Sequence, residues 1–81
     1  MDHTSRSLEG LSGPELEYFL LARLERVARR LADPRTQAIP AWHALARHAT
    51  AVAYRDCVTF GLADEAAVIL REARDEAARS G

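Results

Sequence analysis

The sequence predicts an all-α fold, a bundle of three antiparallel helices preceded by a mobile N-terminal tail. Apolar residues recur at intervals of three and four along three stretches of the chain, which is the spacing of one face of an α-helix. Proline and glycine mark the boundaries of these stretches, and strand-forming aromatic and β-branched residues are few. We therefore expect helices over about residues 13–32, 40–60 and 62–79.

The first helix is expected to begin beside Ser12. Ser12 can cap the helix, and Glu15 three residues later completes a capping box. Residues 1–11 are polar and show no helical period, so we predict that they form a flexible tail. The single folded domain is then expected to span residues 12–80.

The first helix should end just before Pro34, because the residue before a proline avoids the α region. Residues 33–39 are expected to form a connecting loop, with room for one turn of helix. Pro40 suits the first position of the next helix, and Gly61 suits a left-handed cap at its end.

Residues 39–60 form the longest uninterrupted helical pattern, and we expect this helix to lie at the centre of the bundle. The residues of its predicted core face are Trp42, Leu45, Ala49, Val52, Ala53 and Phe60. Asp56 falls in the middle of that face, where the pattern requires an apolar side chain. Asp56 is therefore a candidate buried polar residue.

Residues 61–73, GLADEAAVILREA, contain a glycine, a small residue, a large apolar residue and another alanine in a characteristic order. This segment resembles the second half of a tetratricopeptide repeat, and it covers about a sixth of the chain. Tyr54 departs from the pattern, because that family has a small residue at this point for close helix packing. The resemblance implies a tight antiparallel hairpin between the second and third helices.

Length, charge and cysteine content restrict the class of protein. A chain of 81 residues forms a small core, and such domains often gain stability by oligomerisation. The net charge of −1 provides no general attraction to nucleic acid or anionic lipid. All 11 basic residues are arginine, which we interpret as the codon bias of a GC-rich bacterial genome. The lone Cys57, with no apolar run after Met1 and no stretch that could cross a membrane, favours the cytoplasm.

Two carboxylates form the first candidate site. Antiparallel packing of the first two helices brings Glu17 level with Asp56. Two close carboxylates in an apolar layer cannot both ionise at low cost, and general acid–base enzymes use such pairs. One hypothesis is therefore a small ligand-binding or catalytic protein. The interpretation we favour is structural, with Asp56 bound to Arg71, to Arg6 or to N–H groups at the start of the first helix.

The second candidate site is a surface of the first helix away from its leucine stripe. Its members are two aromatic residues and three arginines: Tyr18, Phe19, Arg23, Arg26 and Arg30. Aromatic residues and arginine are enriched at protein interfaces. Leu21 and Ala28 also widen the apolar arc beyond what two short helices can cover. We predict that this surface forms a homodimer or binds a helical partner protein.

The predicted function is a small cytoplasmic interaction or regulatory module, without catalytic, cofactor or metal residues. His43 and His48 point to different sides of one helix, and Cys57 has no paired histidine and is expected in the core. The helix-one arginines could also contact phosphate, which gives a third hypothesis, a nucleic-acid-binding transcriptional regulator. Acidic residues interrupt these arginines and no helix-turn-helix spacing follows, which argues against nucleic acid.

Overall fold

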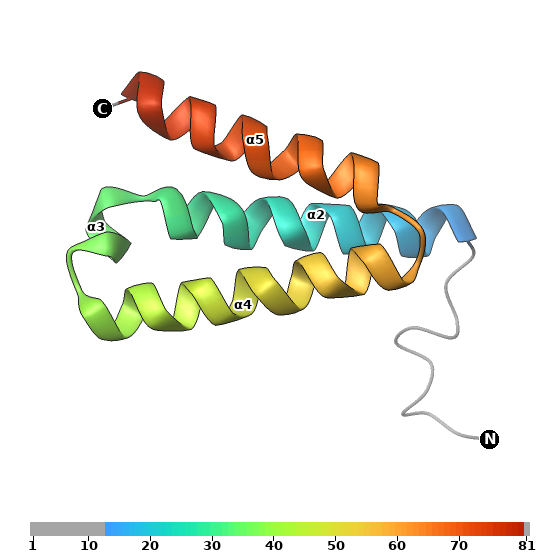
Figure 1. Ribbon diagram of the computed structural model, residues 1–81, viewed down its shortest axis with the longest axis horizontal. Helices are drawn as coiled ribbons and strands as arrows, with labels where there is room; N and C mark the ends of the chain where they lie inside the picture. The colour runs from blue at the N-terminus through green and yellow to red at the C-terminus, as the bar shows by residue number, and fades with distance from the viewer. Residues whose placement is uncertain (1–12, 81) are drawn as a thin grey trace.

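The computed structural model describes residues 13–80 and confirms the all-α class (Figure 1). Its helices in this range are α2 (Gly13–Ala32), α3 (Pro34–Gln37), α4 (Pro40–Thr59) and α5 (Ala63–Ser80). The three long helices begin and end within one residue of the expected boundaries. The predicted tail of residues 1–11 and the predicted cap at Ser12 lie outside the described residues. No helix of the described part is long and apolar enough to cross a membrane.

The connection between α2 and α4 contains the short helix α3. Asp33 caps this helix, since its side chain accepts a hydrogen bond from the backbone N–H of Arg35 at 2.9 Å. The Arg35 guanidinium also donates to Asp33, and these hydrogen bonds hold the pKa of the Asp33 carboxyl below its usual value. Pro34 occupies the first turn, where its missing N–H is not needed. The connection is therefore a folded spacer that separates the end of α2 from the start of α4.

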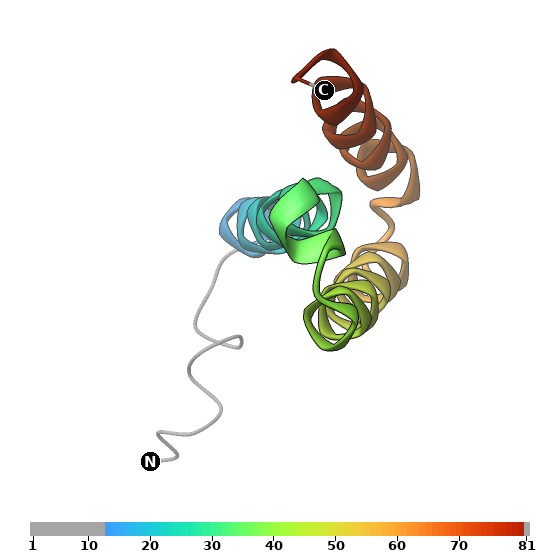
Figure 2. The ribbon, with the colours of Figure 1, turned by 90° about the vertical axis from the view of Figure 1, so that its left-hand side faces the viewer.

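The central helix is α2, so the prediction that residues 39–60 lie at the centre is wrong. α2 packs along both α4 and α5, whereas α4 and α5 make little contact with each other. Figures 1 and 2 show α4 and α5 diverging from the turn that joins them, with α2 alongside both. Gly61 in that turn has the expected left-handed conformation, with φ of 78°. The turn is tight, but the close hairpin implied by the tetratricopeptide resemblance is not formed.

The core explains this arrangement. It is a single cluster that draws on all three long helices and on the turn before α5, and its buried members are Leu20, Leu24, Ala53, Cys57, Leu62 and Ala66. Leu24 and Cys57 are both 0% exposed. Leu62 and Ala66 join the leucines of α2, and this draws the start of α5 onto α2 rather than along α4.

The face of α4 that enters the core also differs from the prediction. Trp42, Leu45 and Phe60 are 56%, 68% and 51% exposed. Of the predicted face only Ala53 is buried, and the other buried residues of α4 are also small: Ala46, Thr50 and Cys57. Small side chains let two helices approach closely, so the large residues of α4 are displaced to its flanks. The predicted face, chosen from large apolar side chains, is rotated by roughly one residue about the helix axis.

Thr50 is the one polar member of this buried α4 face. Its hydroxyl oxygen lies 2.8 Å from the carbonyl oxygen of Ala46 and 3.3 Å from that of Val27 in α2. The hydroxyl therefore has hydrogen-bond partners although it is removed from water, as a buried polar group requires. It also links α4 to α2.

Candidate protein-interaction surfaces

The carboxylate pair expected from the sequence is not buried. Glu17 is exposed, and the Asp56 side chain is 39% exposed. Asp56 Oδ2 accepts a hydrogen bond from Arg23 Nη1 at 2.9 Å, so its partner is Arg23 and not Arg71 or a helix N-terminus. Arg6 lies outside the described residues. The prediction of a buried carboxylate layer is therefore wrong, while a ligand-binding role for either residue stays a prediction.

Cys57 lies next to Asp56 in sequence and is wholly buried. Its sulfur lies 3.6 Å from the carbonyl oxygen of Leu20. Burial raises the pKa of the Cys57 thiol, the Asp56 charge raises it further, and Arg23 lowers it. Since the thiolate is the nucleophilic and metal-binding form, this thiol is held in its unreactive state. Within residues 13–80, no cluster of three His, Cys, Asp or Glu side chains is placed to hold a metal ion.

Tyr18 and Phe19 lie on a side of α2 that no other described helix covers. They are 76% and 43% exposed. Together with four neighbours they line an open hollow of about 650 Å³. We call this set the outer α2 surface: Pro14, Glu15, Tyr18, Phe19, Ala22 and Arg26. Arg26 makes no ion pair with any residue of the described range.

The remaining residues of the predicted interaction surface lie elsewhere. Arg23 turns toward α4 and binds Asp56, and Arg30 lines a separate groove. Leu21 packs against the core, and Ala28 is buried. Both were predicted to lie beyond the surface that two short helices can cover. They are covered because α5 packs along α2. The predicted surface is therefore smaller than expected and is confined to residues 14–26 of α2.

Sequence reasoning missed a groove between α2 and α4 at the end that carries α3. Trp42 and Leu45 form one wall, and Val27 and Arg30 form the other. The groove encloses about 460 Å³. We call it the Trp42 groove, and its other lining residues are Thr36, Ala46, His48 and Ala49. The signal that could have revealed it is the regular spacing of small residues in α4, which leaves Trp42 and Leu45 on a flank.

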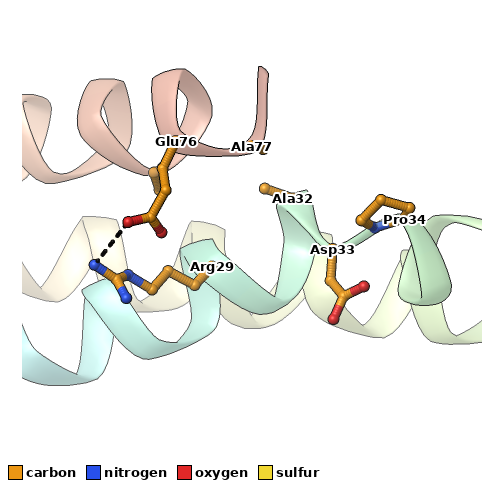
Figure 3. Close-up of a pocket in the computed structure, with 7 residues that line it drawn as sticks. Arg29, Ala32, Asp33, Pro34, Glu76 and Ala77 are labelled. Atoms are coloured by element: carbon orange, nitrogen blue, oxygen red, sulfur yellow. Dashed lines mark ion pairs between the residues drawn. The ribbon is translucent and has the colours of Figure 1, made fainter. Parts of the chain in front are cut away.

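A third, smaller hollow of about 210 Å³ lies between the end of α2 and α5. Figure 3 shows Arg29 and Glu76 directed toward each other across it, and Arg29 Nη2 lies 3.5 Å from Glu76 Oε2. Arg29 also pairs with Glu25 at 3.1 Å. Asp33, which lines the hollow too, is bound to Arg35. Since these charges are already paired inside the protein, the hollow offers little to a charged ligand.

Comparison with known proteins does not assign this chain to a family. No protein-family model matches it, and no curated protein or solved structure is similar to it at a significant level. A functional proposal therefore rests on the two exposed apolar surfaces, the outer α2 surface and the Trp42 groove.

Proposed function

We propose that this protein is a small self-associating interaction module rather than an enzyme, and that two copies pair through the outer α2 surface. The observation that supports this most strongly is the exposure of two adjacent aromatic side chains, 76% for Tyr18 and 43% for Phe19. Aromatic residues and arginine dominate interface hot spots, and Arg26 lies beside these rings. The small core supports the same proposal, because domains of this size often gain stability by oligomerising.

The spacing of the outer α2 surface suits antiparallel pairing with the same helix of a second copy. A two-fold axis midway between Phe19 and Ala22 places the Phe19 ring opposite the partner's Ala22. The same axis brings Glu15 level with the partner's Arg26, and Arg26 level with the partner's Glu15. Each copy then presents the same apolar centre, at Phe19 and Ala22, to the other, which is the self-complementarity that a two-fold interface requires.

Other features favour a protein partner inside a bacterial cytoplasm. Arg23 and Arg29 already bind carboxylates, so they are less available to a phosphate backbone. The buried free thiol of Cys57 suits a reducing compartment. The exclusive use of arginine as basic residue is typical of a GC-rich bacterial genome. Within that setting we propose a regulatory role, in which pairing of the module brings together the proteins that it binds.

Sedimentation equilibrium tests the pairing. The wild-type chain should be a dimer at micromolar concentration, and Phe19→Glu should be a monomer with unchanged helical circular dichroism. Val68→Glu is a matched control, because Val68 is 42% exposed against 43% for Phe19 but lies on α5. This control should remain a dimer. A wild-type chain that stays monomeric up to about 1 mM, where association is worth only about 4 kcal/mol, would overturn the proposal.

Charge reversal tests the antiparallel register. Arg26→Glu should weaken the dimer, since it places two carboxylates opposite each other. The double variant Glu15→Arg with Arg26→Glu restores opposite charges across the two-fold axis and should recover the association. If the double variant associates no better than Arg26→Glu alone, the register is wrong even where a dimer exists.

A further inference from the structure

The Trp42 groove is a second exposed apolar region, and it shares no residue with the outer α2 surface. Trp42 and Leu45 are 56% and 68% exposed, and because both line the same groove they form a shared apolar surface rather than single exposed side chains. α3 lies between the ends of α2 and α4 (Figure 1), and its Thr36 lines the groove together with residues of both helices. Its apolar lining is therefore built into the fold.

The shape of the groove selects an α-helix as its occupant. Its walls are helix surfaces, whose backbone N–H and C=O groups are already bonded within α2 and α4. An extended peptide lying there would leave its own backbone groups without partners, whereas a helix satisfies them internally. Trp42, Leu45 and Ala49 follow one flank of α4 for two turns, about 10 Å, which matches the reach of an apolar stripe on a short helix.

The charge of the groove selects an acidic occupant. Among residues 13–80, the basic side chains that line it are Arg30 and His48, and no carboxylate of that range lines it. Arg30 makes no ion pair with another residue of the range 13–80. A second copy paired symmetrically at this place would offer the Arg30 charge no carboxylate from the described lining of its own groove. A partner that supplies carboxylates matches the groove better than the chain itself does.

We propose that the Trp42 groove binds an amphipathic helix of a different protein. The apolar side chains of that helix, spaced at i, i+3, i+4 and i+7, fill the groove between Trp42 and Val27. Its Glu or Asp side chains pair with Arg30. The bound helix packs against α2 and α4 beside Val27 and Arg30, whereas α5 lies along α2 beside Ala28 and Ala32, and the assembly becomes a four-helix layer.

Trp42 itself reports on the occupancy of the groove, because it is the single tryptophan of the chain. The probes are two synthetic helical peptides with the same leucine stripe, one with glutamates beside the stripe and one with lysines there. The glutamate peptide should shift the Trp42 emission to shorter wavelength in a saturable way, and the lysine peptide should bind at least about tenfold more weakly. Equal binding of both peptides, or binding of neither, would overturn the proposal.

Variants locate the contact and separate it from self-association. Arg30→Glu should bind the glutamate peptide about tenfold more weakly and gain affinity for the lysine peptide. Arg71→Glu, on the exposed side of α5, is the matched control and should bind as the wild-type chain does. Phe19→Glu should also bind the glutamate peptide normally, because the outer α2 surface is separate. If the Trp42 emission of the chain alone shifts with protein concentration, a second copy covers the groove, and the proposal is wrong even if the dimer is real.

Discussion

The two ends of the molecule differ in how completely the side chains that lie between the helices are buried. Near the turn that joins α4 to α5, Leu20, Leu24 and Cys57 are between 0% and 4% exposed. At the other end, near α3, Trp42 and Leu45 are more than half exposed. Hollows of about 210, 410 and 460 Å³ lie between helices at or toward this second end, whereas the hollow of the outer α2 surface, about 650 Å³, lies near the first end on the outside of α2 alone. We call the first the closed end and the second the open end.

The difference follows from the course of α5. The turn at Gly61 holds the end of α4 and the start of α5 against α2. From there α5 diverges from α4 (Figure 2). The buried face of α5 is most completely covered near this turn, where Ala66 is 0% exposed, against 7% for Ala73 farther along the helix. Because buried apolar area supplies most of the folding free energy, stability should be concentrated at the closed end. The open end keeps apolar surface between its helices, whereas the apolar surface near the closed end lies outside the packed helices, at Tyr18 and Phe19.

The largest effect should come from a cavity at the closed end. Leu24→Ala removes a side chain that is 0% exposed and should cost about 2–5 kcal/mol, comparable with the whole stability of a domain of this size. Leu45→Ala at the open end, where the side chain is 68% exposed, should change stability by less than about 0.5 kcal/mol. Urea unfolding of both variants measures the difference. Equal losses would remove the distinction between the ends.

The second effect concerns the turn that forms the closed end. Gly61 has φ of 78° and nothing lies within 4 Å of an added Cβ, so Gly61→Ala should cost roughly 1–2 kcal/mol through backbone strain alone. Gly13→Ala is the matched control, since it also has open space but lacks a positive φ. It should be neutral or slightly stabilising. Thermal unfolding measures the stability change of both variants. Equal changes would show that the left-handed turn does not constrain α5.

A smaller effect is expected from the Arg23–Asp56 ion pair on the flank between α2 and α4. Both side chains are about one-third exposed, 32% and 39%, so a double-mutant cycle should give a coupling of about 0.2–1 kcal/mol that decreases with salt. The cycle uses Arg23→Ala, Asp56→Ala and the double variant. A coupling above about 3 kcal/mol is typical of a buried pair and would restore the buried Asp56 expected from the sequence.

The smallest effect at neutral pH concerns Cys57. Burial raises the pKa of its thiol above the usual value of 9.0, so the folded state retains its proton at a pH where the unfolded chain loses it. The free energy of unfolding is therefore unaffected below about pH 8 and decreases as the pH rises through 9.0 toward the folded pKa. Cys57→Ala should lack this alkaline decrease. Identical pH profiles of the two chains above pH 9.0 would show that Cys57 is not buried as a thiol.

Local signals account for what the sequence predicted well. Pro40 and Gly61 set the ends of α4 through their own backbone preferences, which need no knowledge of the rest of the fold. Tyr18 and Phe19 lie off the leucine stripe of α2 and are exposed in the structure. Helix boundaries and the α2 surface could therefore be derived from short-range spacing.

The phase of α4 could not be derived in this way. This helix has two competing apolar stripes, a large one that includes Trp42 and Leu45 and a small one that includes Ala46 and Ala53. Which stripe enters the core depends on how closely α2 approaches, and that is a property of the packed pair. The same ambiguity placed Asp56 in the core and concealed the Trp42 groove. The one sequence signal for the observed arrangement is the helical spacing of the small residues of α4. The intervals between Ala46, Thr50, Ala53 and Cys57 are four, three and four residues.

Native-state hydrogen exchange tests the division into a closed and an open end most directly. We predict that amides around Leu24 and Cys57 exchange only through global unfolding, with the full free energy and denaturant dependence of that transition. Amides between Ala73 and Ala77 in α5 should exchange through a separate opening, with a lower free energy and a weaker dependence on denaturant. The same free energy and denaturant dependence for both groups of amides would show that the protein is held together equally at both ends, which would contradict this account.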